Sequence, residues 1–314
     1  MNIVFMGTPD FAVPCLKALA DAGENIRAVF TQPDKPKGRG YKMIPTPVKS
    51  AALEMGAEVY QPLSLRKGED AERSLSVLKE ISPDLIVVVA YGQILPEEIL
   101  NLPKYGCINV HGSLLPEYRG AAPMQWCLLN GEKKTGVTTM MMDKGLDTGD
   151  MLLKEETEIG ENETLSELHD RLAECGAEVL IKTIEALRDG TLVRIPQDDE
   201  KSTYSPMITK NMSLIDFSDT AQNIHNRIRA ITGFAFINNR RLKIFRSELT
   251  GKKSNENPGT VIEASSEFLV VCGDGEIIRF TEVQPEGSRR MKAYDYLRGS
   301  KLQPGSVFTR GEEI

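Results

Sequence analysis

Three polar residues in two segments near the middle of the chain have side chains suited to proton or acyl transfer. Asn109 and His111 are separated by one residue at the end of a short apolar run, and Asp147 lies in a polar, glycine-bearing segment. Residues two apart in an extended strand point to the same face, so the amide and the imidazole would lie side by side. We therefore take Asn109, His111 and Asp147 as the candidate catalytic residues.

A structural role is the alternative for each of these residues. A single histidine near a strand end is more often a satisfied polar residue than a catalyst, and a lone loop aspartate is as often merely solvated. The residues after His111 favour function, because residues 112–116 and 118–120 form a turn-rich stretch of the kind that binds ligands. A strand over residues 106–111 would also put His111 at its carboxyl end, where open α/β sheets bind ligands.

The alternation of apolar runs and helix-period segments predicts a parallel sheet covered by helices. Val- and Ile-rich runs predict strands, and the apolar spacing over residues 164–189 predicts a long helix before Gly190. Residues 135–142 and 151–158 read as two strands joined by a loop that contains Asp147. The Val- and Ile-rich runs are residues 3–6, 26–30, 85–90 and 107–110.

The chain is predicted to contain two domains with a connector between them. Its 314 residues exceed the usual size of one domain. Residues 191–206 lack sustained periodicity and contain two prolines, as an exposed linker would. After a predicted helix at 218–231, short strand-like runs indicate a small barrel. We predict an N-terminal α/β domain at 1–190 and a C-terminal β domain at 207–314. The strand-like runs are residues 241–248, 260–263, 268–272 and 277–283.

Several classes of protein are disfavoured by motif and composition. The Gly7 turn resembles the start of a dinucleotide-binding unit, but the Gly-x-Gly-x-x-Gly fingerprint and the Walker sequence are both missing. The five scattered cysteines lack a Cys-x-x-Cys pair, which predicts reduced thiols, and the distant histidines predict a site without metal. The apolar runs are too short to cross a bilayer, so a cytoplasmic protein without a membrane partner is expected.

The distribution of charge permits a nucleic-acid partner in spite of a net charge of −7. Residues 207–314 carry 16 Lys and Arg against 13 Asp and Glu, so the acidic excess lies in the N-terminal part. Within that part, residues 34–49 form a basic segment with an aromatic residue, suited to phosphates and unpaired bases, although a solvated loop is the alternative. Cations of the C-terminal part that we consider for phosphate contact are Arg227, Arg229, Arg240, Arg241, Lys243, Lys252 and Lys253.

Two long motifs, residues 109–120 (Asn-Val-His-Gly-Ser-Leu-Leu-Pro-Glu-Tyr-Arg-Gly) and 143–150 (Asp-Lys-Gly-Leu-Asp-Thr-Gly-Asp), resemble the formyltransferase family that uses 10-formyltetrahydrofolate. The similarity to the members that formylate methionyl-tRNA extends over the whole chain. It implies a Rossmann-like N-terminal domain, an OB-like barrel at the C-terminus, and formyl transfer to charged initiator tRNA for translation initiation. It also implies a monomer.

The resemblance assigns roles to residues of this sequence. Asn109 and His111 would stabilise the oxyanion, and Asp147 would orient His111, keep it protonated and relay a proton. The folate donor would lie against Ser113, Leu114, Leu115 and Pro116, with its pterin near the backbone of Tyr91, Gly92, Gln93, Ile94 and Leu95. Contacts to tRNA would come from Lys35, Lys37, Arg39 and Lys42, and Phe11 is a candidate for the methionine pocket.

The catalytic residues by themselves leave the acceptor open. Relatives of the same chemistry act on amino sugars or on glycinamide ribonucleotide, and a tRNA-binding protein without catalysis is a different class again. The basic segment around Arg39 and the C-terminal domain favour tRNA, whereas a sugar N-formyltransferase would share the catalytic residues and need no such segment. His169 and His225 are predicted to be surface or packing residues.

Overall fold

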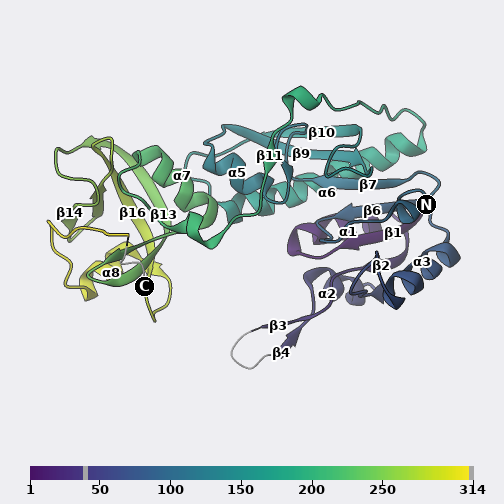
Figure 1. Ribbon diagram of the computed structural model, residues 1–314, viewed down its shortest axis with the longest axis horizontal. Coiled ribbons are helices and arrows are strands. Elements are labelled where there is room, and N and C mark those ends of the chain that lie inside the picture. The colour runs from purple at the N-terminus through teal and green to yellow at the C-terminus, as the bar shows by residue number, and fades with distance from the viewer. Residues whose placement is uncertain (38–41, 311–314) are drawn as a thin grey trace. The chain divides into compact units, whose positions relative to one another are not determined.

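A computed structural model describes residues 1–37 and 42–310, which pack as two compact units (Figure 1). The N-terminal unit comprises Met1–Gly120, Thr135–Thr157 and His169–Tyr204, and the C-terminal unit comprises the rest of the described chain. The second unit therefore includes two short insertions from the first part of the sequence, Ala121–Lys134 and Glu158–Leu168, in addition to the residues after Tyr204. Arg39 lies outside the described residues.

A seven-stranded, mostly parallel sheet is the centre of the N-terminal unit. β1 pairs in parallel with β2 and β6, and β6 pairs in parallel with β7, whereas β7 and β9 are antiparallel. β6 is buried along its whole length, as expected for a central parallel strand covered on both faces. In spatial order the strands are β10 (Met151–Glu158), β9 (Lys134–Met141), β7 (Cys107–His111), β6 (Leu85–Val89), β1 (Asn2–Gly7), β2 (Asn25–Phe30) and β5 (Val59–Tyr60).

The strand order reverses direction between β1 and β6. From β1 the chain continues outward through β2 to β5, and it then returns to β6 and continues to β7 on the other side. Ligands of open α/β sheets bind beyond the carboxyl ends of strands near such a switch point. Gly7 at the end of β1 is required there, because a Cβ would lie 2.9 Å from the Ala12 Cβ. The carboxyl end of β7, where His111 lies, is one strand away.

Helices connect the strands of this unit. α1 begins with a proline in its first turn, and α2 has Thr46 as its N-cap, whose Oγ1 accepts from Lys49 N at 3.1 Å. The helices are η1 (Asp10–Ala12), α1 (Val13–Asp21), α2 (Pro47–Glu54), α3 (Glu69–Ile81), α4 (Glu97–Leu100), α6 (Leu165–Arg188, which begins in the C-terminal unit) and η2 (Asp199–Lys201). Further short strands are β3 (Lys35–Lys37), β4 (Lys42–Ile44), β8 (Arg119–Gly120) and β11 (Tyr204–Ser205).

The C-terminal unit contains an antiparallel sheet that closes on itself. The sheet has the order β12-β13-β16-β15-β14, and β17 pairs with β16. Bridges from Phe236 to Thr309 and from Thr260 to Val307 join both edges to one segment, so the sheet forms a small barrel. Its elements are α5 (Pro123–Leu129), η3 (Lys210–Ser213), α7 (Ala221–Ile231), β12 (Gly233–Ile237), β13 (Arg240–Lys253), β14 (Val261–Ala264), β15 (Phe268–Val271), β16 (Glu276–Pro285), β17 (Met291–Lys292) and α8 (Ala293–Gly299).

The predicted fold class, a mostly parallel α/β domain followed by a β domain, is confirmed. Part of the basic segment at residues 34–49 forms a short hairpin, in which Lys37 of β3 pairs with Lys42 of β4. All five cysteines are free, and burial raises the pKa of the thiols of Cys15, Cys107 and Cys272 to about 12. In the described ranges, none of the helices is long and apolar enough to cross a membrane.

His225 is a packing residue of the C-terminal unit. Its Nε2–H donates to the carbonyl of Glu161 at 3.0 Å, and its Nδ1 lies 2.9 Å from Ser247 Oγ, which makes Nδ1 the acceptor of the serine proton. The side chain is almost completely buried, and this desolvation lowers the pKa of His225 below its usual value. The neutral ring is therefore part of the folded state.

Acid is expected to destabilise the C-terminal unit through His225. The pKa of His225 is lower in the folded than in the unfolded chain. Its contribution to the free energy of unfolding is therefore complete above about pH 6.5 and is lost as the pH falls below that value. His225→Gln should flatten the dependence of unfolding free energy on pH between about 7 and 5. Urea titrations followed by the fluorescence of Trp126, the one tryptophan of the chain, measure this unit. Equal slopes for variant and wild type would contradict the assignment.

Candidate active site

Asn109 and His111 lie in the C-terminal part of β7, on the same face of the strand. The Asn109 backbone is in register with Val88 of β6 and Met140 of β9, and that of His111 with Thr138 of β9. This pairing on both sides holds the strand in place, so the two side chains have fixed starting points. Within residues 1–37 and 42–310, the Asn109 amide makes no hydrogen bond, and it is therefore available to a ligand.

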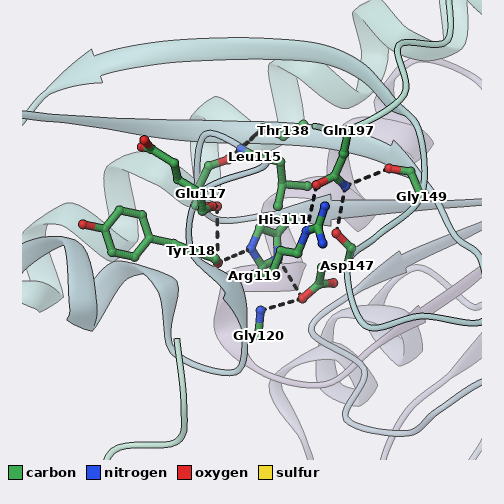
Figure 2. A network of polar contacts seen from close by, with 11 residues as sticks. His111, Leu115, Glu117, Tyr118, Arg119, Gly120, Thr138, Asp147, Gly149 and Gln197 are labelled. Carbon is green, nitrogen blue, oxygen red and sulfur yellow. Dashed lines mark hydrogen bonds and ion pairs between the residues drawn. The ribbon is translucent and has the colours of Figure 1, made fainter. Parts of the chain in front are cut away.

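The imidazole of His111 is buried between two protein groups (Figure 2). Its Nε2 lies 2.9 Å from the carbonyl oxygen of Tyr118, and its Nδ1 lies 3.7 Å from Oδ2 of Asp147. Because a carbonyl oxygen can only accept, Nε2 carries a proton, and Nδ1 faces the carboxylate. A proton gained at Nδ1 would complete a cation beside that carboxylate.

Asp147 is brought to His111 by the loop between β9 and β10. Its Oδ2 accepts a hydrogen bond from Gly120 N at 2.9 Å, and its side chain is mostly buried. The structure thus brings together His111 and Asp147, which are 36 residues apart, and joins the two motif segments through the hydrogen bond from Gly120 N to the Asp147 carboxylate.

Two residues that flank His111 have left-handed backbones. Tyr118 has a φ of 59° and Asp147 a φ of 57°, values that cost a residue with a Cβ on the order of 1 to 3 kcal/mol. Such conformations persist only where the surroundings hold them, and they cluster at functional sites. Tyr118 N donates to Thr203 Oγ1 at 2.7 Å, and the Asp147 carbonyl accepts from Gln197 Nε2 at 2.8 Å.

The segment Ser113–Pro116, predicted to contact folate, is held from both sides. The buried Ser113 hydroxyl donates to the Glu117 carbonyl at 2.7 Å, while Leu115 N donates to Thr138 Oγ1 at 3.1 Å. Lys154 of β10 donates to the Leu115 carbonyl, and burial lowers the pKa of this lysine. The segment therefore has a defined shape beside His111, with Leu114 half-buried and Leu115 in a small apolar cluster.

The predicted pterin contacts lie in the turn after β6. Some of these residues are used within the protein, and others are free to contact a ligand. Tyr91 and Leu95 are buried in the core, and the Gln93 amide is used by Leu65 N and by the Pro62 carbonyl. Gly92 has a φ of 84°, which permits the turn, and Ile94 is 65% exposed. Ile94 is therefore the residue of this turn whose exposed side chain is free to pack against a ligand.

The remaining predicted residues lie far from His111 in the sequence, in the hairpin and in η1. The hairpin carries Lys35 and Lys37 on β3 and Lys42 on β4, and Lys35 is exposed. Phe11 is 5% exposed and packs against the ring of His169 at 5.4 Å, so it contributes mainly to the core. His169 also lies 3.4 Å from Asp10.

The sequence matches a known family over both units. Residues 1–184 match the formyl transferase family, and residues 207–301 match its C-terminal domain. The chain belongs to the formyl transferase family. Proteins named methionyl-tRNA formyltransferase from Caldanaerobacter subterraneus and Alkaliphilus oremlandii are each 50% identical to this family member, over 98% of its chain and 99% of theirs.

Solved structures of this family have the same fold. A sugar 3N-formyl transferase, WlaRD, in the presence of dTDP and 5-N-formyl-THF, superposes with a TM-score of 0.67 at 23% identity, covering 92% of this chain and 99% of that one. An N-formyltransferase from Helicobacter canadensis gives a TM-score of 0.64 at 22% identity, covering 91% and 99%. These likenesses concern the fold.

Sequence reasoning missed three residues that surround the site. Arg119 belongs to a quoted motif but had no predicted role, and Gln197 and Thr203 lie in the segment expected to be an exposed connector. Gln197 donates to the carbonyls of Asp147 and Gly149 and accepts from Arg119 Nε. Polar residues in a segment without periodicity give no signal of such contacts, because their partners are about 50 to 80 residues away.

Proposed function

We propose that this protein transfers a formyl group from 10-formyltetrahydrofolate to the amino group of methionyl-tRNA. The observation that carries the proposal is identity of 50% over 311 residues with a protein named methionyl-tRNA formyltransferase, along almost the full length of both chains. A match of this extent covers the C-terminal unit as well as the catalytic motifs, and the C-terminal unit is where an acceptor-specific surface is expected.

The site supports this reaction through three groups. The acceptor amine forms a bond to the formyl carbon while the bond to the folate nitrogen breaks, and one proton passes from the amine to that nitrogen. We assign stabilisation of the formyl oxygen to the free Asn109 amide and to His111. The Nδ1 side of His111, beside Asp147, is the side that can take up and release the proton.

The folate donor is assigned to the surface beside β6 and β7. Ile94 offers an exposed apolar side chain, and the left-handed backbone at Ala90 and Gly92 turns peptide groups out of the sheet. Backbone groups of such a turn can pair with the polar edge of a pterin while an apolar side chain covers its face. The shaped segment Ser113–Pro116 is the second wall that we propose.

The activity is tested by incubating the pure protein with 10-formyltetrahydrofolate and methionyl-tRNA and measuring labelled formyl transfer. Uncharged tRNA and an amino sugar are the control acceptors. Transfer to methionyl-tRNA alone is the expected result. Transfer to the sugar alone would make the protein a sugar N-formyltransferase, and binding of tRNA without transfer would make it a tRNA-binding protein. Use of initiator rather than elongator tRNA, in the cytoplasm and as a monomer, belongs to the same proposal.

We assign tRNA contact to the β3–β4 hairpin and to residues 207–314, with residues 191–206 as the connector. Lys35 is exposed, and Arg241 and Lys243 line a small surface cavity. Arg229 is not suited to phosphate contact, because it is buried and donates to Asn226 and to the carbonyl of Gly160. The prediction that Arg229 contacts phosphate is therefore wrong.

Lys35→Gln is expected to raise the KM for methionyl-tRNA severalfold and to leave kcat within about twofold, because the cation is lost from the acceptor surface and not from the reacting groups. The slope of log KM against log salt concentration should fall by about one unit, because one contact to phosphate is lost. The matched control is Lys79→Gln on α3, an exposed lysine of the same unit, which should change neither value. An unchanged slope for Lys35→Gln would remove Lys35 from the acceptor surface.

A further inference from the structure

We infer that residues 195–203 form a strap that holds both polar neighbours of His111, the Tyr118 carbonyl and the Asp147 carboxylate, in place, with Gln197 and Thr203 as positioning residues for the transfer reaction. This inference rests on the proposed function, since it concerns the rate of the same reaction. The strap is anchored where it begins, because the backbones of Ile195 and Met151 exchange two hydrogen bonds of 2.9 Å.

Gln197 holds the Asp147 side of His111. Its Nε2 donates to two carbonyls of the loop between β9 and β10, those of Asp147 and Gly149, each at 2.8 Å, and its Oε1 accepts from Arg119 Nε at 2.9 Å (Figure 2). Both amide protons and the amide oxygen are therefore used. Carbonyls can only accept and a guanidinium can only donate, so the orientation of the amide is determined, and glutamate cannot make the same set of bonds.

Thr203 holds the Tyr118 side of His111. Its Oγ1 accepts from Tyr118 N at 2.7 Å, and its carbonyl accepts from Arg119 N at 2.9 Å. The Tyr118 carbonyl, on the same residue, is the acceptor for His111 Nε2. A shift in the Tyr118 backbone would move that acceptor, and the imidazole would follow it.

The two residues held by the strap are the two with left-handed backbones beside His111. Tyr118 and Asp147 both have a Cβ and a φ close to 60°, so neither conformation is the preferred one for a free loop. Each is tied to the strap through its own backbone, Tyr118 by its N–H and Asp147 by its carbonyl. The strap thus holds the backbones of Tyr118 and Asp147 in these conformations. Relaxation of either residue would move its polar group away from the imidazole.

Gln197→Met tests the strap, because it keeps the length of the side chain and removes all three hydrogen bonds. We expect kcat for transfer to methionyl-tRNA to fall about 10- to 100-fold with KM for both substrates within about threefold, since the substrate-contacting groups remain and only their geometry changes. Thr203→Val, which removes the acceptor for Tyr118 N, should lower kcat about 10-fold. Glu200→Gln, on the exposed outer side of the same segment, is the matched control and should stay within about twofold.

A double-mutant cycle separates positioning from general damage. If Gln197 acts through Asp147, Gln197→Met should cost less than about twofold when it is added to Asp147→Ala, because the group that it positions is already gone. Thermal unfolding is followed in parallel, and if the methionine variant does not fold, Gln197→Glu, which keeps the acceptor for Arg119, replaces it. A kcat within twofold of wild type in a folded variant, or full additivity with Asp147→Ala, would overturn the inference. Failure of the wild type to formylate methionyl-tRNA in the same assay would instead count against the proposed function.

Discussion

Replacing His111 with alanine is expected to lower the rate of formyl transfer by about 10²- to 10⁴-fold while the protein remains folded. The imidazole is the group beside Asn109 with a ring nitrogen that can pass a proton, since Nδ1 faces the Asp147 carboxylate. Alanine removes the group that passes the proton, while the hydrogen bond from Gly120 N to the Asp147 carboxylate is kept. Single-turnover transfer to methionyl-tRNA measures the chemical step directly.

The same assay compares the other members of the site. Asn109→Ala should cost about 10²- to 10³-fold, the loss typical of one oxyanion donor, and Asp147→Ala should also lower the rate sharply. Ser74→Ala is the control, because it removes a buried polar group on α3 of the same unit without touching the site. Near wild-type turnover by a folded His111→Ala protein would rule out the assigned mechanism.

Gly149→Ala is expected to destabilise the N-terminal unit by about 3 kcal/mol and to abolish most of the activity. A Cβ at this position would overlap the backbone oxygen of Met141, a rigid part of the sheet, so the loop that contains Asp147 must move. The Gly149 carbonyl would move with it, away from Gln197 Nε2. Thermal unfolding should show a melting temperature lower by about 6 to 12 °C.

The control for Gly149→Ala is Gly299→Ala in α8, where an added Cβ meets nothing within 4 Å and the backbone conformation is ordinary. That substitution should change stability by less than about 1 kcal/mol. If the two alanine variants unfold at the same temperature and Gly149→Ala retains full activity, the close approach between the loop and Met141 does not constrain the site.

The main elements of the fold could be predicted from the sequence because their signals are local. The Val- and Ile-rich runs at β1, β6 and β7 are continuous, since central parallel strands are buried on both faces. The helix over α6 follows from apolar spacing that a single segment displays by itself. The hairpin of β3 and β4 was missed, because its three-residue strands are too short and too polar to give a pattern.

The grouping of the candidate catalytic residues could be predicted in part, for a different reason. Asn109 and His111 are two residues apart, so strand geometry puts them on one face before anything is known of the rest of the chain. Asp147 was linked to them by the resemblance of two motifs, and its distance of 3.7 Å from His111 depends on packing. Likewise, the position of the Nε2 proton follows from the Tyr118 carbonyl, which no sequence pattern indicates.

The sequence by itself determined the order of the elements, the two-part organisation and the placement of Asn109 and His111 on one face of a strand, because each of these is encoded in short stretches. Tertiary structure decided what surrounds His111. Gln197 and Thr203 lie in a segment without periodicity, and their roles come from hydrogen bonds to Asp147 and Tyr118 over separations of 50 and 85 residues. Contacts at such separations arise only when the sheet and its loops are assembled, since hydrogen bonds depend on where atoms lie in space and not on their spacing along the chain.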